Sequence, residues 1–357
     1  MAHPYTNKPD YQFWKRAGGI DSLSTLDPVT KCSFRISRNE PVITAGSCFA
    51  QHVAKRLSEN GFNYFVCEKA HSLIPDSVAL ANNYGVFSAR YGNLYTARQL
   101  KQLLQRAWGN HVPIENTWQL ANGNFVDPFR PQVQPGGFIS EAELNIDREQ
   151  HFAAIRRGIK KMSVFVFTLG LTEAWADKRD GSVFPLAPGV AGGTYNPDIH
   201  EFVNFDLNDT LNDLRWSIKY LRRRNPNCKI IITVSPVPLN ATAVDRHVLV
   251  STVYSKSVLR IAAEDVCNTF EFCDYFPSYE IITAPHAGGV YFASDKRSVT
   301  EAGVDHVMGL FLKHYGDTDG ATHQPESDDG REAVENHRTA MENVVRVLCD
   351  EEAIDNT

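Results

Sequence analysis

The chain contains three short apolar segments, and none of them alternates hydrophobic with polar positions. They span residues 42–45 (VITA), 164–169 (VFVFTL) and 229–234 (KIIITV). β-Branched and aromatic residues fill each segment, which is typical of strands that are buried on both faces of a sheet. The pattern therefore predicts a parallel sheet whose faces are covered by helices.

Segments with a helical period lie between and after these strands. In residues 206–224 the apolar positions recur every three or four residues, as on one face of a helix, at Leu207, Leu211, Leu214, Ile218 and Leu221. The Asn-Pro pair at 225–226 ends this helix before the third strand. Further helices are expected at 48–60, 97–107, 149–161, 251–266 and 299–314. The alternation of strands and helices predicts an α/β fold with crossover helices.

Two parts of the chain depart from this alternation. Residues 109–147 are dense in Pro, Gly and Asn, so we expect a loop-rich insertion, either a substrate lid or an excursion that packs on the surface. After residue 315 the sequence becomes polar and acidic, and a last helical pattern covers 332–353. We divide the chain into an α/β domain, residues 1–315, and an acidic linker with a C-terminal helix, residues 316–357. That helix would dock on the core or serve a partner.

Composition narrows the class of protein. The 357 residues carry a formal net charge of -6, which argues against a surface for nucleic acid or for an anionic membrane. No apolar segment has the length of a signal peptide or a membrane span, so a cytoplasmic location is expected. The seven cysteines are scattered and odd in number, and we expect them to be reduced. Neither a metal site nor a nucleotide cofactor is predicted, because their common motifs are missing.

The candidate chemistry lies where the first strand passes through Gly46 into a helix. Ligands of open α/β sheets bind beyond the carboxyl ends of the strands. Ser47 is expected to be the N-cap, because its hydroxyl can accept a hydrogen bond from a backbone N–H. Cys48 would then lie in the first turn, where the helix dipole and the backbone amides favour a thiolate and stabilise an oxyanion. The alternative is that Cys48 is a small buried hydrophobe.

The same stretch, TAGSCFAQHVAKRL, resembles the hallmark of the GSCFA family. Further stretches resemble that family too, among them NNYGVFSARYGNLYTARQL, FVFTLGLTEAW, TVSPVPLNAT, STVYSKSVLR and GVYFASDKRSVTEAG. The family is similar to the SGNH (GDSL-like) hydrolase superfamily. This resemblance implies a flavodoxin-like, three-layer α/β/α sandwich with a mostly parallel sheet. It also implies ester hydrolysis or acyl transfer on glycans or small esters.

The resemblance implies roles for residues in the first two sequence blocks of the superfamily. In the first block Gly46 matches the glycine, Ser47 takes the place of an aspartate, and Cys48 takes that of the nucleophile. This agrees with the interpretation from local physics. The second block supplies an oxyanion-hole glycine, which corresponds to Gly85, with Asn82 or its neighbour Asn83 as a side-chain donor.

The third block, Gly-x-Asn-Asp in the superfamily, resembles Gly170, Thr172 and Glu173. Thr172 replaces the amide donor of that block with a hydroxyl. The alternative is that these residues form an ordinary turn from a strand into a helix.

The fourth block departs from the superfamily pattern, which is Asp-x-x-His. The chain keeps Asp295 but has Ser298 in place of histidine. Ser298 with Glu301 fits the pattern of a capping box at the start of the last helix of the domain. The base is therefore expected elsewhere.

Three histidines are candidates for that base. His286 is the first choice, because it lies just upstream of Asp295; His247 is the second and His200 the third. Asp295 or Glu173 would orient the imidazole. A cysteine nucleophile depends less on an adjacent base than a serine does.

The resemblance makes an SGNH-like acyl-ester hydrolase or O-acyltransferase the leading hypothesis. It would transfer or release an acyl group, with acetyl as the expected one, from a sugar or small metabolite through a thioester on Cys48. No cofactor is expected, and acetyl-CoA is a candidate acyl donor. Hydrolysis and transfer use the same residues, so both stay open, and no oligomeric state is predicted. The rival hypothesis is a non-catalytic SGNH-like protein that binds a glycan or a partner.

Overall fold

The computed structural model describes residues 3–317 and 350–356, and the predicted α/β fold is confirmed. Its central sheet has four strands in the order β1-β4-β8-β9, all parallel. These are β1 (Val42–Gly46), β4 (Val164–Leu169), β8 (Lys229–Val234) and β9 (Cys273–Tyr275). Beyond β1, Val42 forms an isolated parallel bridge with Tyr64. With that bridge as a rudimentary second strand, the order is that of a flavodoxin-like sheet.

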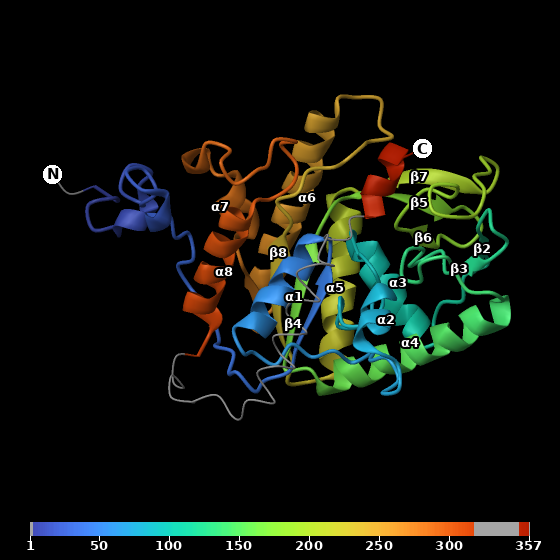
Figure 1. Cartoon of the computed structure of the whole chain (residues 1–357). Coiled ribbons are helices and arrows are strands. Elements are labelled where there is room, and N and C mark those ends of the chain that lie inside the picture. The colour runs from blue at the N-terminus through green and yellow to red at the C-terminus, as the bar shows by residue number, and fades with distance from the viewer. Residues whose placement is uncertain (1–2, 318–349, 357) are drawn as a thin grey trace.

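Helices cover both faces of this sheet, which makes a three-layer α/β/α sandwich (Figure 1). The helices that pack on one face are α3 (Ala97–Ala107), α4 (Glu141–Lys161), α5 (Leu207–Arg224) and α6 (Val248–Thr269). Those on the other face are α1 (Phe49–Glu59), α7 (Ser278–Thr283) and α8 (Glu301–Tyr315).

Smaller elements surround the sandwich. They are α2 (Asp76–Ala81), the hairpin of β2 (Trp118–Gln119) and β3 (Phe125–Val126), and the antiparallel sheet of β6 (Val183–Phe184), β5 (Glu173–Asp177) and β7 (His200–Asn204). Four 3-10 helices complete the described chain: η1 (Asp10–Gln12), η2 (Leu23–Thr25), η3 (Pro285–Ala287) and η4 (Asp350–Asn356). None of the helices within these described ranges is long and apolar enough to cross a membrane.

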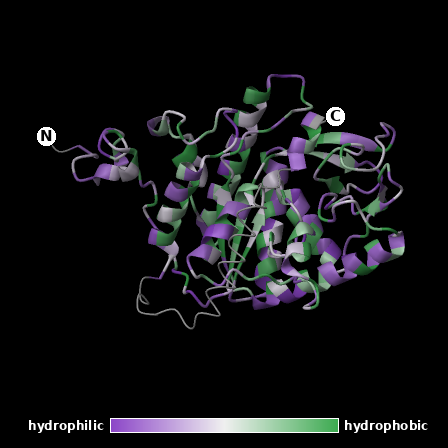
Figure 2. Cartoon of the chain, in the orientation of Figure 1, coloured by the Kyte–Doolittle hydropathy of each residue, from purple (hydrophilic) through white to green (hydrophobic). Residues whose placement is uncertain are grey.

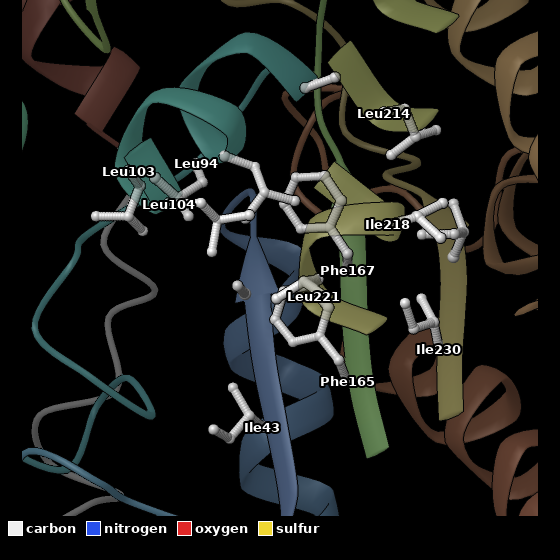
Figure 3. Packing of buried hydrophobic residues seen from close by; sticks show 14 of the residues in the cluster. Ile43, Leu94, Leu103, Leu104, Phe165, Phe167, Leu214, Ile218, Leu221 and Ile230 are labelled. Atoms are coloured by element: carbon white, nitrogen blue, oxygen red, sulfur yellow. The ribbon is translucent and has the colours of Figure 1, made fainter. Parts of the chain in front are cut away.

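The strands lack alternation because both of their faces are buried. Ile43, Phe165 and Phe167 point toward the leucines of α3 and α5 (Figure 3). Their neighbours Val42 and Val164 pack on the opposite face, against α1 and α8. Hydrophobic residues accordingly gather along the central strands and the helix sides that face them (Figure 2).

Several helix boundaries differ from prediction because of their caps. α4 begins at Glu141 rather than 149, since Ser140 accepts a hydrogen bond from the Glu143 amide at 3.2 Å. The predicted capping box of Ser298 is wrong: Thr300 caps α8 and accepts from the Gly303 amide at 3.3 Å. Of the helix predicted at 332–353, residues up to 349 lie outside the described ranges, and residues 350–356 form η4.

The insertion at 109–147 packs as part of the fold. The Trp118 ring lies against Phe184 of the small sheet, with ring centroids 5.0 Å apart. Asp127 is 1% exposed and contacts three guanidinium groups, those of Arg130 and Arg148 at 3.1 Å and of Arg106 at 3.6 Å. This buried network favours the surface-packing interpretation of the insertion over a lid.

Candidate active site

The carboxyl end of β1 turns into α1 through Gly46, whose φ is +135°. A Cβ at this position would lie 2.2 Å from the carbonyl oxygen of Thr168 and 2.7 Å from its amide nitrogen. Only glycine therefore lets the chain pass this close to β4. The Ser47 amide then donates to the same Thr168 carbonyl at 3.0 Å. This fixes the turn between β1 and β4, the topological switch point at which flavodoxin-like sheets bind ligands.

Ser47 does not cap α1, so that prediction is wrong. The helix begins at Phe49, and its N-cap position is Cys48. The Ser47 hydroxyl is buried and has no hydrogen-bond partner among the described residues. The helix begins one residue too late for Ser47 to be its N-cap. The Ser47 Cβ lies at the end of β4, since a Cβ on Gly170 would be 3.0 Å from it.

Replacing Ser47 with alanine is expected to change the free energy of unfolding by less than about 0.5 kcal/mol, or to increase it, because the hydroxyl that is lost has no partner. Loss of a true N-cap costs about 1 kcal/mol. Urea unfolding measures the difference, with Ser140→Ala, which removes the observed cap of α4, as the matched control. A loss at Ser47 as large as that at Ser140 would restore the capping role.

Cys48 is the N-cap residue of α1, one position before the first turn in which it was predicted, and it is 4% exposed. Its surroundings differ from those of the other buried thiols. Cys67 and Cys228 pack in the hydrophobic core beneath α3–α6, and burial raises the pKa of Cys67 to about 12 and that of Cys228 above its usual value. Cys48 belongs to neither of the two large core clusters. Its role as a nucleophile stays a prediction.

The loop at 91–95 joins the ends of β1 and β4 beside Ser47. The Leu94 amide donates to the Gly46 carbonyl at 2.8 Å, and the Tyr95 carbonyl accepts from the Gly170 amide at 2.9 Å. Asn93 is 1% exposed, and its side-chain oxygen accepts from Nε2 of Gln51, in the first half of α1, at 3.2 Å. Asn93 is therefore an amide side chain placed next to the Ser47–Cys48 turn.

Asn82 and Gly85, the predicted oxyanion residues of the second block, lie in a different environment. The Asn82 amide nitrogen donates to the Val78 carbonyl at 2.8 Å, and its side-chain oxygen accepts from Gln134 of the insertion at 2.7 Å. Gly85 follows in a turn with φ of +86°. The side chain of Asn82 closes α2 against the insertion, so the contacts do not support its predicted oxyanion role.

Of the third block, only Gly170 lies against the turn from β1 into α1. Gly170 follows β4 and lies against Ser47 and Tyr95, and its carbonyl accepts from Lys256 Nζ at 2.6 Å. The Thr172 hydroxyl, however, donates to the side-chain oxygen of Asn204 at 2.7 Å, so its proton is already used in a structural hydrogen bond. The chain continues into strand β5 and not into a helix, which corrects the alternative reading of this segment.

Glu173 is buried, and its carboxylate accepts from the Thr242 hydroxyl at 2.7 Å. Burial raises the pKa of Glu173. Asp295 is exposed and closes its own turn, accepting from the Arg297 and Ser298 amides at 2.9 and 3.0 Å and from the Ser298 hydroxyl. These contacts give neither carboxylate the predicted role of orienting a histidine.

Two of the three candidate histidines have structural partners. His200 accepts from the Asn196 amide at 3.0 Å and pairs with Glu115 at 2.8 Å. His247 is exposed and caps α6 by accepting from the Leu249 amide at 3.1 Å. Both ring nitrogens of His286 are buried and lack a partner among the described residues. The His286 ring lies against Trp14 of the N-terminal segment, with centroids 4.8 Å apart.

The C-terminal 3-10 helix η4 reaches the same junction. Asp350 Oδ2 accepts from Asn93 Nδ2 at 3.0 Å, and the Asp350 amide donates to the Tyr95 hydroxyl at 3.0 Å. Glu351 pairs with Arg297 at 2.8 Å. Three residues at this junction were not predicted from the sequence: Asn93, Lys256 and Arg297. The sequence did carry a signal for Asn93. In YGNLYT it directly follows Gly92, so that an amide side chain comes after a glycine.

No cluster of three or more His, Cys, Asp or Glu side chains that could hold a metal ion occurs within residues 3–317 and 350–356. The model of the GSCFA family matches residues 41–311. No curated protein matches the chain. Among solved structures, a family 3 carbohydrate esterase from Clostridium thermocellum is similar, with 10% identity over 77% of this chain and 94% of that chain and a TM-score of 0.32.

Proposed function

We propose that this chain, which belongs to the GSCFA family, is an acyl-ester hydrolase or O-acyltransferase that forms a thioester on Cys48. One observation carries the proposal. Cys48 opens α1 at the switch point between β1 and β4, and it lies outside both large apolar clusters. Ligands of such sheets bind at this point, and a helix start favours a thiolate and stabilises a developing oxyanion.

The reaction follows from this placement. The Cys48 thiolate attacks the acyl carbonyl, and collapse of the tetrahedral intermediate forms the thioester and expels the alcohol or thiol of the donor. A proton from the base goes to that leaving group. Water then attacks the thioester in hydrolysis, or a sugar hydroxyl attacks it in transfer, and the same base accepts the proton of the attacking group. The carbon–sulfur bond breaks and the Cys48 thiolate is released as the leaving group.

Asn93 is the proposed side-chain donor to the oxyanion, in place of Asn82, Gly85 and Thr172. Its Nδ2 now donates to a carboxylate oxygen of Asp350 at 3.0 Å, so it is able to bind a negatively charged oxygen at this junction. Removal of one such donor typically lowers kcat by about 10²–10³-fold.

His286 is the proposed base. Among the three candidates, His200 and His247 use ring nitrogens in structural hydrogen bonds, whereas both ring nitrogens of His286 lack a partner within the described residues. Asp295 and Glu173 are held by Ser298 and Thr242, so the imidazole works without either carboxylate. A thiolate nucleophile tolerates this better than a serine does.

The proposed substrate is a sugar or small metabolite, and acetyl-CoA is the proposed acyl donor because thiol-borne acyl groups exchange readily with a thiol. A reducing, cytoplasmic compartment suits this chemistry, since it keeps a catalytic cysteine reduced. No further cofactor enters the proposal.

The second candidate function is ligand binding without catalysis. It is favoured by the replacement of the superfamily histidine by Ser298, whose hydroxyl is bound to Asp295. A non-catalytic protein would still use the β1–β4 junction for its ligand, but Cys48 would then form no thioester.

An acyl-donor screen separates these functions. Purified protein is incubated with acetyl-CoA and with p-nitrophenyl acetate, with and without a panel of sugars, and free acetate is scored against acetylated sugar. We expect turnover of at least one donor, with the ratio of the two products distinguishing hydrolysis from transfer. No product and no covalent adduct with any donor would leave ligand binding as the function.

A further inference from the structure

Part of the chain itself lies against the candidate active site. Asp350 is 5% exposed and Glu351 is 8% exposed, although both belong to an acidic sequence after the α/β domain. Their contacts are with residues far away in sequence, on loops and helices that follow the carboxyl ends of the strands. Figure 1 shows this C-terminal turn at the same end of the sandwich as the small β5–β7 sheet.

Five polar residues hold these two acids, and we call them the carboxyl cluster. They are Asn93, Tyr95, Asn240, Lys256 and Arg297. Asn93 and Tyr95 bind Asp350 through its carboxylate and its backbone amide, each at 3.0 Å. Arg297 pairs with the Glu351 carboxylate at 2.8 Å, and Asn240 donates to the Glu351 carbonyl at 3.1 Å.

The cluster is built from groups that are themselves buried. Asn93 is 1% exposed and Lys256 is 2% exposed. Lys256 donates to the Gly170 carbonyl beside Ser47, and its charge lowers the pKa of Glu351 against the larger, opposing effect of burial. Burying a lysine and most of an arginine is costly unless an acid is bound close by. The cluster is thus suited to carboxyl groups.

The position of the cluster connects it to the reaction. Asn93, which binds Asp350, also accepts from Gln51 of α1, and Gly170 lies against both Ser47 and Tyr95. A carboxyl group on the cluster is therefore connected through Asn93 to Gln51, three residues after Cys48 in α1.

We propose that the carboxyl cluster is a subsite for a small ligand that bears carboxyl groups, and that Asp350 and Glu351 occupy it as an internal competitor. This inference rests on the proposed function, because the subsite is part of an active site only if that function is correct. Its test measures binding alone, so a failure of catalysis and a failure of the subsite are separate results.

The displacing variant is Glu351→Lys in the full chain. It places a third cation beside Arg297 and Lys256, which repel it, so the C-terminal turn should leave the cluster. Asp355→Lys is the matched control, because it makes the same change at an exposed residue of the same turn. Thermal unfolding checks that both variants keep the α/β domain folded, and a chain that ends at residue 349 serves as a second displaced form.

The probe is an acetylated peptide with the sequence of residues 350–356, DEEAIDN, titrated calorimetrically. We expect at least tenfold tighter binding to Glu351→Lys than to Asp355→Lys, because the internal competitor is gone. The peptide AAEAIDN should not bind, and adding Arg297→Gln to Glu351→Lys should weaken binding of DEEAIDN about tenfold. Glutarate, a small dicarboxylate, should displace the peptide.

The affinity should also depend on pH. Burial raises the pKa of Asp350 to about 7, against the hydrogen bond from Asn93, and burial raises the pKa of Glu351 as well, against Arg297 and Lys256. Both carboxyl groups therefore have a higher pKa when they are docked on the cluster than when they are exposed to solvent. Docking is thus strongest below about pH 4, where the groups are protonated in both states, and is lost as the pH rises through about 7. Peptide affinity should therefore fall between about pH 4 and about pH 7 and level off at higher pH.

Three results would overturn the subsite. They are equal affinity of Glu351→Lys and Asp355→Lys for DEEAIDN, equal affinity for DEEAIDN and AAEAIDN, and peptide binding that glutarate does not displace. The last result would show recognition of the C-terminal turn alone.

Discussion

Turnover of the acyl donor should fall by at least about 10³-fold in Cys48→Ala, since loss of a nucleophile removes the covalent pathway and leaves only the binding groups. The proposed thioester requires sulfur at the start of α1, where Cys48 lies. Steady-state release of p-nitrophenol from p-nitrophenyl acetate, followed with thermal unfolding of the same samples, measures the effect.

Cys32→Ala is the matched control for this prediction. Cys32 is partly buried, and burial raises the pKa of its thiol, so its removal should leave turnover within about twofold of the parent. Equal losses in the two variants would mean that Cys48 has no special role. Full activity in Cys48→Ala would move the chemistry to another residue, with Ser47 the first to examine.

The second large effect concerns stability. Asp127→Asn should lower the free energy of unfolding by about 3–5 kcal/mol, because it removes the carboxylate charge that three buried guanidinium groups share and leaves only Arg130 with another one, Asp147 at 2.6 Å. Burial alone would raise the pKa of Asp127, but Arg106, Arg148 and Arg130 outweigh it and hold that pKa well below its usual value. The stabilisation is therefore fully present at pH 7 and is lost only as the pH falls below about 4.

Urea unfolding at pH 7 tests this, with Asp198→Asn as the control. Asp198 is exposed, so the same isosteric change there should cost less than about 0.5 kcal/mol. If Asp127→Asn unfolds at the same urea concentration as Asp198→Asn, the buried network does not hold the insertion in place.

The layers of the sandwich were predictable because they rest on local patterns. Residues 164–169 and 229–234 are strands with the predicted bounds, and α3 spans 97–107 as expected. Strand β9 and the small sheet of β5 and β7 were missed. β9 is short, with only three residues. β5 and β7 form an antiparallel pair, and neither contains a run of apolar residues that would predict a strand.

The candidate site was predictable at one point, the turn from β1 into α1. Its geometry depends on Gly46, and glycine followed by a helical pattern is visible in sequence. The partners of that turn were not predictable, because Asn93, Lys256 and Arg297 come together only through tertiary packing. The sequence also predicted a cap at Ser47, and the cap is missing because α1 begins at Phe49, which makes Cys48 the N-cap residue.

The position of Asp350 and Glu351 was the least predictable feature. Their acidic surroundings in sequence indicate a solvated linker, yet both are buried. Their partners lie between 54 positions away, for Arg297 and Glu351, and 257 positions away, for Asn93 and Asp350. Long-range pairing of this kind leaves no periodic signal.

Peptide mapping of an acid-quenched reaction tests the central claim most directly. After incubation with a labelled acyl donor, the label should be found on Cys48 and should be released by neutral hydroxylamine, which cleaves thioesters much faster than oxygen esters. A hydroxylamine-resistant label on Ser47, or a peptide 41–57 that never acquires label while product forms, would contradict sulfur as the acyl carrier.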